Sequence, residues 1–195
     1  RRLTAINLMK RMESSVYSFN LTLKRILALI DDTIQRIDAY DKNAGDTLSL
    51  TDISNMEDQF DADDQGESEL FTFGRKVKIE IGDMDYVSWR RSLVKDRDVL
   101  ELLTLMVGDI TPQYDSKLQK LLQVLKNKIE NPINPGNRKV IIFTAFADTA
   151  EYLYENVSPY MLETFGLHTA MVSGNVEGRT TVPKLRSDLN TVLTC

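Results

Sequence analysis

Apolar residues recur at intervals of three and four along the first forty residues, which is the spacing of one face of an α-helix. The interval breaks at Ser14-Ser15, a pair of residues typical of a helix start. The sequence therefore predicts two consecutive helices within residues 1–40. The second has the longer apolar face, formed by Val16, Phe19, Leu23, Ile26, Leu27, Ile30, Ile34 and Ile37.

The same spacing predicts two more helices in the middle of the chain. Asp85 is a candidate N-cap for a helix that continues to Val107 and is interrupted at residues 108–112. Asp115 or Ser116 is a candidate N-cap for the next helix, which ends at the Asn- and Pro-rich residues 131–137. Its predicted apolar face consists of Leu118, Leu121, Leu122, Leu125 and Ile129.

A different pattern begins at residue 138. Residues 140–143, Val-Ile-Ile-Phe, form a short apolar run that is typical of a strand buried on both faces of a parallel sheet. Residues 148–151, Asp-Thr-Ala-Glu, match a capping box, and Gly166 marks the end of the helix that follows it. The predicted apolar stripe of that helix consists of Ala150, Leu153, Tyr154, Val157 and Met161.

Residues 167–172 complete this pattern as a second predicted strand, and Pro183 is expected to open a last helix over residues 184–195. Two parallel strands joined by one helix form a βαβ unit, for which we expect a right-handed crossover. The predicted fold class is therefore α/β: mostly helical, with a partial parallel sheet near the C-terminus. Ligands on such sheets gather at the carboxyl ends of the strands.

The distribution of charge changes the interpretation of the net charge of −5. Residues 43–74 contain no Lys or Arg and nine acidic residues, so the rest of the chain carries about +4. We interpret this segment as an acidic mobile insert, with a basic protein as a possible partner. Its Asp61–Gly66 stretch is a faint echo of an EF-hand calcium loop with Gly66 at the sixth position. Gln65 occupies the fifth position and Thr72 the twelfth, so calcium binding is not expected.

The sequence contains no self-contained active site. There is one Cys and one His, so neither a disulfide framework nor a Cys- or His-based metal site is expected. The chain has no P-loop motif, and Gly174 and Gly178 do not form a dinucleotide-binding fingerprint. No apolar run is long enough to span a membrane, and a cytoplasmic location is expected.

Three stretches resemble a known family. DSKLQKLLQVLKNKI, RKVIIFTAFADTAEYL and GLHTAMVSGNV follow one another in the order found in the second RecA-like lobe of bacterial superfamily 2, Snf2-like helicases. RKVIIFTAFADTAEYL resembles helicase motif IV and its helix. LMKRMESSVYSFNLTLKRI also resembles a helix found ahead of that lobe. The resemblance covers about two thirds of the chain and implies a partial RecA-like sheet near its C-terminus.

The resemblance implies a parent protein that hydrolyses ATP with Mg²⁺ and moves on nucleic acid, with double-stranded DNA expected. The P-loop, the Mg²⁺-binding motif and the arginine finger would lie outside this chain, so we expect no catalytic residue, no metal and no cofactor in it. By resemblance, Thr144, Ala145, Phe146, Ser173 and Gly174 face the nucleic-acid backbone. The alternative that Thr144 and Ser173 only terminate strands is equally consistent with the sequence.

Four regions follow from these patterns: helices over residues 1–42, the acidic insert at 43–74, a helical segment at 75–114 and the truncated lobe at 115–195. The chain starts and stops inside helical patterns, so we interpret it as a piece of a larger protein. Two other interpretations remain open. One is a non-catalytic helical interaction module with a small α/β cap, and the other is a degenerate nucleotide-binding or flavodoxin-like domain.

Overall fold

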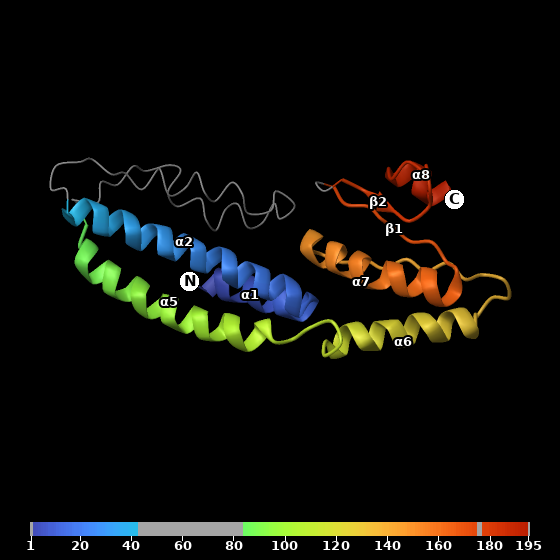
Figure 1. Cartoon of the computed structure of the whole chain (residues 1–195), viewed down its shortest axis with the longest axis horizontal. Helices are drawn as coiled ribbons and strands as arrows, with labels where there is room; N and C mark the ends of the chain where they lie inside the picture. Colours follow the sequence, from blue (N-terminus) through green and yellow to red (C-terminus); the bar gives the residue numbers. More distant parts are fainter. Residues whose placement is uncertain (1, 43–83, 175–176, 195) are drawn as a thin grey trace. The chain divides into compact units, whose positions relative to one another are not determined.

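The computed structural model describes residues 2–42, 84–174 and 177–194. Their helices are α1 (Arg2–Ser14), α2 (Val16–Lys42), α5 (Tyr86–Gly108), α6 (Ser116–Glu130), α7 (Ala147–Phe165) and α8 (Leu189–Thr194), and their strands are β1 (Ala170–Met171) and β2 (Arg179–Thr180) (Figure 1). The chain forms two compact units. The first contains Arg1–Met9 and Phe19–Asp109, and the second contains Lys10–Ser18 and Ile110–Cys195.

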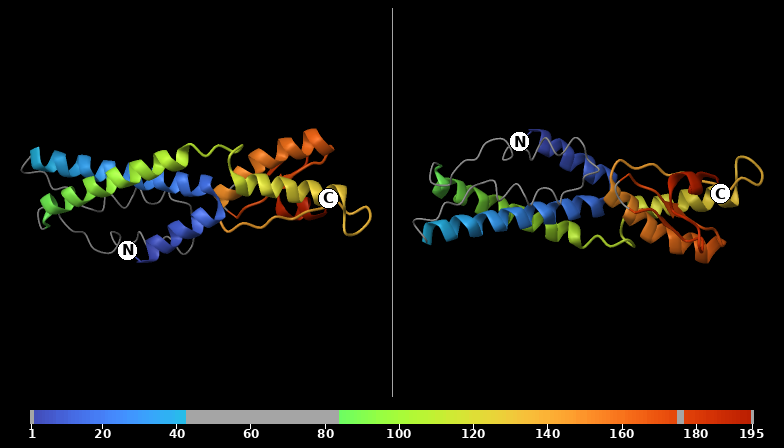
Figure 2. Two further views of the ribbon diagram at one scale, coloured as in Figure 1. Left: turned by 90° about the horizontal axis from the view of Figure 1, so that it is seen from below. Right: turned by 90° about the horizontal axis from the view of Figure 1, so that it is seen from above.

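The first unit is built on the antiparallel pairing of α2 with α5, which lie side by side in Figures 1 and 2. Arg90 of α5 donates two hydrogen bonds to the carboxylate of Asp38, from Nε to Oδ1 at 2.5 Å and from Nη2 to Oδ2 at 3.1 Å. One turn away, the rings of Tyr40 and Tyr86 meet edge to face at 5.5 Å. The predicted apolar face of α2 supplies the buried residues Leu23, Ile34 and Ile37.

The second unit is built on α6 and α7, which also lie side by side. The predicted apolar face of α6 packs against α7, and the buried core consists of Leu118, Leu125, Ile129, Tyr152, Val157 and Met161. Asp115 is the N-cap of α6: its Oδ1 accepts from the backbone N–H groups of Lys117 and Leu118, both at 3.0 Å. Gly166 ends α7 in the left-handed conformation, with φ 64°. These end signals agree with the sequence prediction.

The predicted parallel sheet is absent from the described residues, and the predicted α/β fold class is wrong. The only sheet there is the two-stranded antiparallel pair of β1 and β2, in which Ala170 lies opposite Thr180 and Met171 opposite Arg179. Residues 140–143 form no strand. An apolar run identifies a segment that is able to pair, but a strand forms only where a second strand supplies hydrogen bonds. The described chain is therefore mostly helical.

Other local predictions also need correction. The helix α7 begins one residue before the predicted capping box, with Phe146 as N-cap and no side-chain cap, because Asp148 is engaged in an ion pair instead. Tyr152 is buried on α7, whereas the predicted stripe contained Tyr154. The last helix is α8, which begins at Leu189 and not at residue 184.

Several predictions remain untested. The acidic segment at residues 43–74, with its faint calcium-loop likeness, lies outside the described residues. The proposed division into four regions also stays a prediction.

Replacing Asp115 by Ala is expected to destabilise the second unit by roughly 2–3 kcal/mol, because the change removes a helix cap and leaves the buried Tyr152 hydroxyl without its acceptor. Hydrogen exchange of the α6 amides, monitored as urea is added, measures the loss in the free energy of unfolding. Asp85→Ala is the matched control, since Asp85 caps α5 through Ser88 at an exposed position. An equal loss in both variants would contradict the role given to the Tyr152 contact.

Candidate functional site

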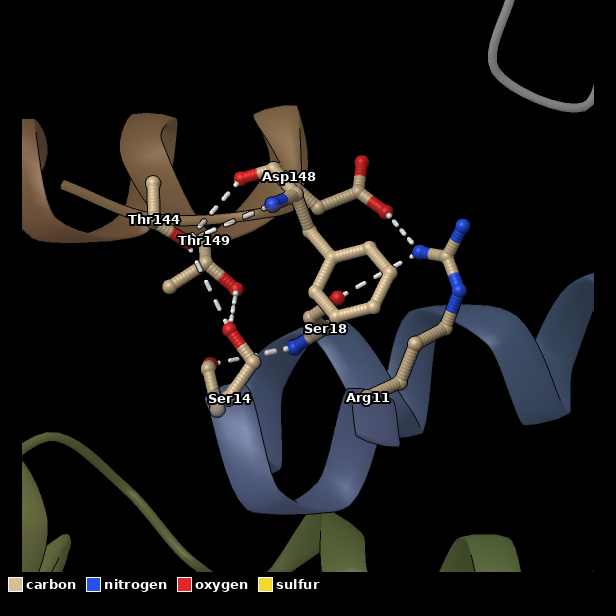
Figure 3. Close-up of polar contacts among 8 residues, drawn as sticks. Arg11, Ser14, Ser18, Thr144, Asp148 and Thr149 are labelled. Carbon is tan, nitrogen blue, oxygen red and sulfur yellow. Dashed lines mark hydrogen bonds and ion pairs between the residues drawn. The ribbon is translucent and has the colours of Figure 1, made fainter. Parts of the chain in front are cut away.

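A buried ion pair joins two segments of the second unit that are far apart in the sequence. Arg11 Nη1 lies 3.2 Å from Asp148 Oδ2, and the two residues are only 3% and 5% exposed (Figure 3). The same nitrogen lies 3.4 Å from Ser18 Oγ, and the guanidinium carbon lies 4.7 Å from the centre of the Phe146 ring. Asp148 stands in the first turn of α7, where a negative charge also stabilises the helix dipole.

Three hydroxyl groups gather beside this ion pair. Ser14 Oγ lies 3.0 Å from Thr149 Oγ1 and 3.5 Å from Thr144 Oγ1 (Figure 3). The end of α1 therefore contacts the first turn of α7 and the segment that precedes it. Thr144 Oγ1 accepts from the backbone N–H of Phe146 at 3.3 Å. Each hydroxyl has one donor and two acceptor positions, so the cluster retains capacity for a further polar ligand.

The third component is an aromatic and carboxylate cluster at the start of α6. Tyr152 donates from its hydroxyl to Asp115 Oδ2 at 2.9 Å, and its ring stacks on that of Tyr17 with 4.9 Å between the ring centres. Burial, and then the hydrogen bond to Asp115 and the charge of that carboxylate, raise the pKa of Tyr152 well above its ordinary value. Lys117 donates from Nζ to the backbone carbonyls of Glu13 and Ser14, the last residues of α1.

The hydroxyl cluster and the Asp115–Tyr152 pair border an open pocket of about 370 Å³ in the second unit. The residues that line the pocket are Ser14, Ser15, Asp115, Lys117, Leu118, Leu121, Ile142, Phe143, Thr144, Ala145, Thr149, Tyr152 and Leu153. The arrangement is suited to binding a small polar group, because Ser and Thr side chains and one Lys are among the lining residues. Among the residues that line it, no nucleophile is paired with a base.

The predicted site residues are not all brought together. Thr144 and Ala145 line the pocket, whereas Phe146, Ser173 and Gly174 do not. Phe146 forms the N-cap of α7 and lies under the Arg11 guanidinium, while Ser173 and Gly174 follow β1. The prediction that all five face one ligand relied on two parallel strands ending at the same sheet edge. That edge does not exist in the described residues.

Sequence reasoning missed the residues that contact Thr144 and its neighbours across the fold. From the sequence, Ser14 was interpreted only as part of a helix break and Asp115 only as a helix cap. Arg11 and Asp148 are separated by 137 positions, so no local spacing pairs them. The sequence offered one indication that these two residues are related: Arg11 and Asp148 both lie in stretches that resemble the helicase family.

The described residues hold no cluster of three or more His, Cys, Asp or Glu side chains able to bind a metal ion. Within that part of the chain, no helix has the length and apolar character needed to cross a membrane. No family model, curated protein or solved structure matches the chain.

The Arg11–Asp148 pair is expected to show strong coupling in a double-mutant cycle. Asp148→Leu alone should destabilise the second unit by roughly 3–5 kcal/mol, because it leaves a buried guanidinium without its carboxylate. Arg11→Met combined with Asp148→Leu should regain most of that loss, since two apolar side chains then occupy the site. Urea unfolding of the four chains of the cycle measures the coupling.

The exposed pair of Lys126 and Glu130, 3.9 Å apart on α6, is the matched control. The coupling energy of this exposed pair should be no larger than about 0.5 kcal/mol. Equal coupling in the two cycles would contradict the importance of burial for the Arg11–Asp148 contact.

Stability is expected to fall at alkaline pH through Tyr152. A folded-state pKa above the unfolded value of about 10 means that folding favours the neutral phenol, so this contribution is complete below pH 10 and is lost as the pH rises further. Tyr152→Phe should therefore lessen the decrease in the free energy of unfolding at alkaline pH. Near neutral pH the same change should lower the free energy of unfolding by about 1 kcal/mol. Urea unfolding as a function of pH tests this, with the exposed Tyr114→Phe as control. Identical alkaline slopes for Tyr152→Phe and the unmodified chain would contradict it.

Proposed function

We propose that the chain is a non-catalytic part of an ATP-dependent, helicase-like DNA translocase and contributes a surface that faces the nucleic-acid backbone. The proposal begins from the resemblance of four stretches to Snf2-like helicases. It does not depend on the parallel sheet, which the described residues lack. In this proposal, ATP and Mg²⁺ are bound by other parts of the motor, and the motor is cytoplasmic.

The observation that supports the proposal most directly is the packing of two of these stretches on each other. LMKRMESSVYSFN supplies Arg11 and Ser14, and IFTAFADT supplies Thr144, Asp148 and Thr149. An ion pair and two hydroxyl contacts join them inside one compact unit. Segments that act together in a motor need such contacts, because a binding surface must keep its geometry under load.

The chemistry of the pocket suits a phosphate group. Contacts to the nucleic-acid backbone come mainly from Lys and Arg, from Ser and Thr hydroxyls and from backbone N–H groups. Thr144, Ser14 and Thr149 supply hydroxyls, and Lys117 supplies a cation beside them. The proposal therefore gives Thr144 a contact to the nucleic-acid backbone, with Ala145 leaving room for close approach. The roles predicted for Phe146, Ser173 and Gly174 remain predictions.

The surrounding surface is also compatible with a polyanion. Residues 116–139 carry six basic side chains and one acidic side chain. The basic residues are Lys117, Lys120, Lys126, Lys128, Arg138 and Lys139, and all except the half-buried Lys128 are exposed. Neutralising phosphates with such cations makes binding weaken as salt concentration rises.

Fluorescence anisotropy with a labelled DNA duplex at several salt concentrations tests the proposal on the whole chain. We expect weak, salt-sensitive binding. Lys117→Gln should reduce the salt slope by about one, and Thr144→Val should weaken binding by roughly fivefold through the loss of one hydrogen bond. Lys95→Gln and Thr164→Val are matched controls, because both residues are exposed and lie outside the pocket lining and outside residues 116–139.

The chain alone is expected to hydrolyse no ATP. Steady ATP turnover by the purified chain would contradict the non-catalytic assignment. DNA binding that is equally sensitive to the pocket variants and to their controls would contradict the assignment of the pocket to the backbone.

A helical interaction module is the second candidate, and one feature of α5 favours it. No residue of α5 is buried, and its second half exposes Val99, Leu102, Leu105 and Met106. Exposed apolar side chains concentrated on one helix are typical of protein–protein contact surfaces. The two functions are separated by the same titration, because a module of this kind binds no DNA at any salt concentration.

A further inference from the structure

The pocket of the second unit offers more than a phosphate group uses. Its volume of about 370 Å³ lies within the range of small-molecule sites, roughly 300–1,000 Å³, and a phosphate group fills only part of it. Among the residues that line it are the apolar Leu118, Leu121, Ile142, Phe143 and Leu153. A ligand that matches the whole lining therefore has an apolar part joined to its anionic part.

The cation and the hydroxyls of the lining are connected through Ser14. Lys117 donates from Nζ to the backbone carbonyls of Glu13 and Ser14, which holds the ammonium group beside Ser14. The Oγ of the same serine lies 3.5 Å from Thr144 Oγ1. An ammonium group has three donors, so Lys117 retains one donor for an anion beyond its two carbonyl contacts.

Asp115 is the one acidic residue of the lining, and its charge is already compensated. Its carboxylate accepts from the backbone N–H groups of Lys117 and Leu118 and from the Tyr152 hydroxyl, and the residue is 4% exposed. Hydrogen bonds of this kind stabilise the ionised carboxylate. The Lys117 ammonium is therefore not needed to neutralise Asp115.

Phe143 adds an aromatic ring to this lining. The residue is 90% exposed, and Thr144, with its hydroxyl in the polar cluster, follows it directly. The exposed cations Arg138 and Lys139 precede it in the same segment. Aromatic rings on which bases stack, combined with cations along the backbone, are how proteins hold single-stranded nucleic acid. This combination indicates a nucleobase as the group that covers the Phe143 ring.

We propose that the pocket receives one unpaired nucleotide of a nucleic-acid strand, with its phosphate at Lys117, Ser14 and Thr144 and its base stacked on Phe143. The inference rests on the function proposed above, which assigns the pocket to the nucleic-acid backbone, and adds the base. Bases inside a duplex reach such a ring only by leaving their stack. Stacking accepts every base, so the pocket distinguishes unpaired from paired strands and reads no sequence.

A strand without bases separates the two contacts. Fluorescence anisotropy on the whole chain compares a labelled oligothymidylate with an abasic strand that has the same number of phosphates. We expect the oligothymidylate to bind roughly tenfold more tightly, through stacking, and the two strands to share one salt slope. Equal affinities with a salt slope would overturn the stacking inference and leave the backbone assignment standing. No salt-sensitive binding of either strand would overturn the proposed function as well.

Substitutions at Phe143 test the ring itself. Phe143→Ala and Phe143→Leu should both remove the roughly tenfold preference for the oligothymidylate and leave abasic binding unchanged, because neither side chain stacks. Phe143→Trp should keep the preference. Tyr114→Ala is the matched control, since Tyr114 is 79% exposed and lies outside the lining. A loss of affinity for both strands by the same factor would show a merely structural role and overturn the proposal.

Competition distinguishes a strand from a free nucleotide, which has the same phosphate and base. Thymidine monophosphate should displace the labelled oligothymidylate only at a concentration at least a hundredfold above that of unlabelled oligothymidylate, because it lacks the neighbouring phosphates that the surrounding cations bind. Displacement by the two competitors at equal nucleotide concentration would assign the pocket to a small molecule and overturn the assignment to a strand.

Discussion

The second unit depends on one buried electrostatic contact, the ion pair between Arg11 and Asp148. A guanidinium that is 3% exposed is tolerated only where a carboxylate and further polar groups compensate its loss of water. Asp148, Ser18 and the Phe146 ring provide that compensation. Because a charge pair has strict geometry, the contact fixes how Lys10–Ser18 lies against the start of α7. The Ser14, Thr144 and Thr149 hydroxyls meet as a consequence.

The same contact explains why the pocket exists. Lys10–Ser18 brings Ser14 and Ser15 to one side, the turn before α7 brings Thr144 and Ala145, and the start of α6 brings Asp115 and Lys117. Apolar packing of α6 on α7 forms the buried core of the second unit, but it does not orient hydroxyl groups. The polar contacts therefore give the pocket its shape, and the proposed phosphate-facing role follows from that shape and from the cations near it.

Local signals predicted much of this molecule, and long-range pairing was not predictable. The N-caps at Asp85 and Asp115, the Gly166 helix end and the apolar face of α6 follow from interactions within a few residues. Residues 140–143 have a strand sequence without a partner strand, so composition alone led to the wrong fold class. The nucleic-acid-facing role expected for Thr144 and Ala145 stays a prediction, although both residues line the pocket. The contacts of Arg11 and Asp115 became visible only when segments more than thirty residues apart were brought together.

Hydrogen exchange of the whole chain tests most directly whether Lys10–Ser18 belongs to the second unit through this contact. The account predicts that amides of residues 10–18 and of the first two turns of α7 open together, with the same free energy, and that Asp148→Leu lowers both equally. It would be contradicted if residues 10–18 exchanged freely while α7 stayed protected, because the two segments would then be independent.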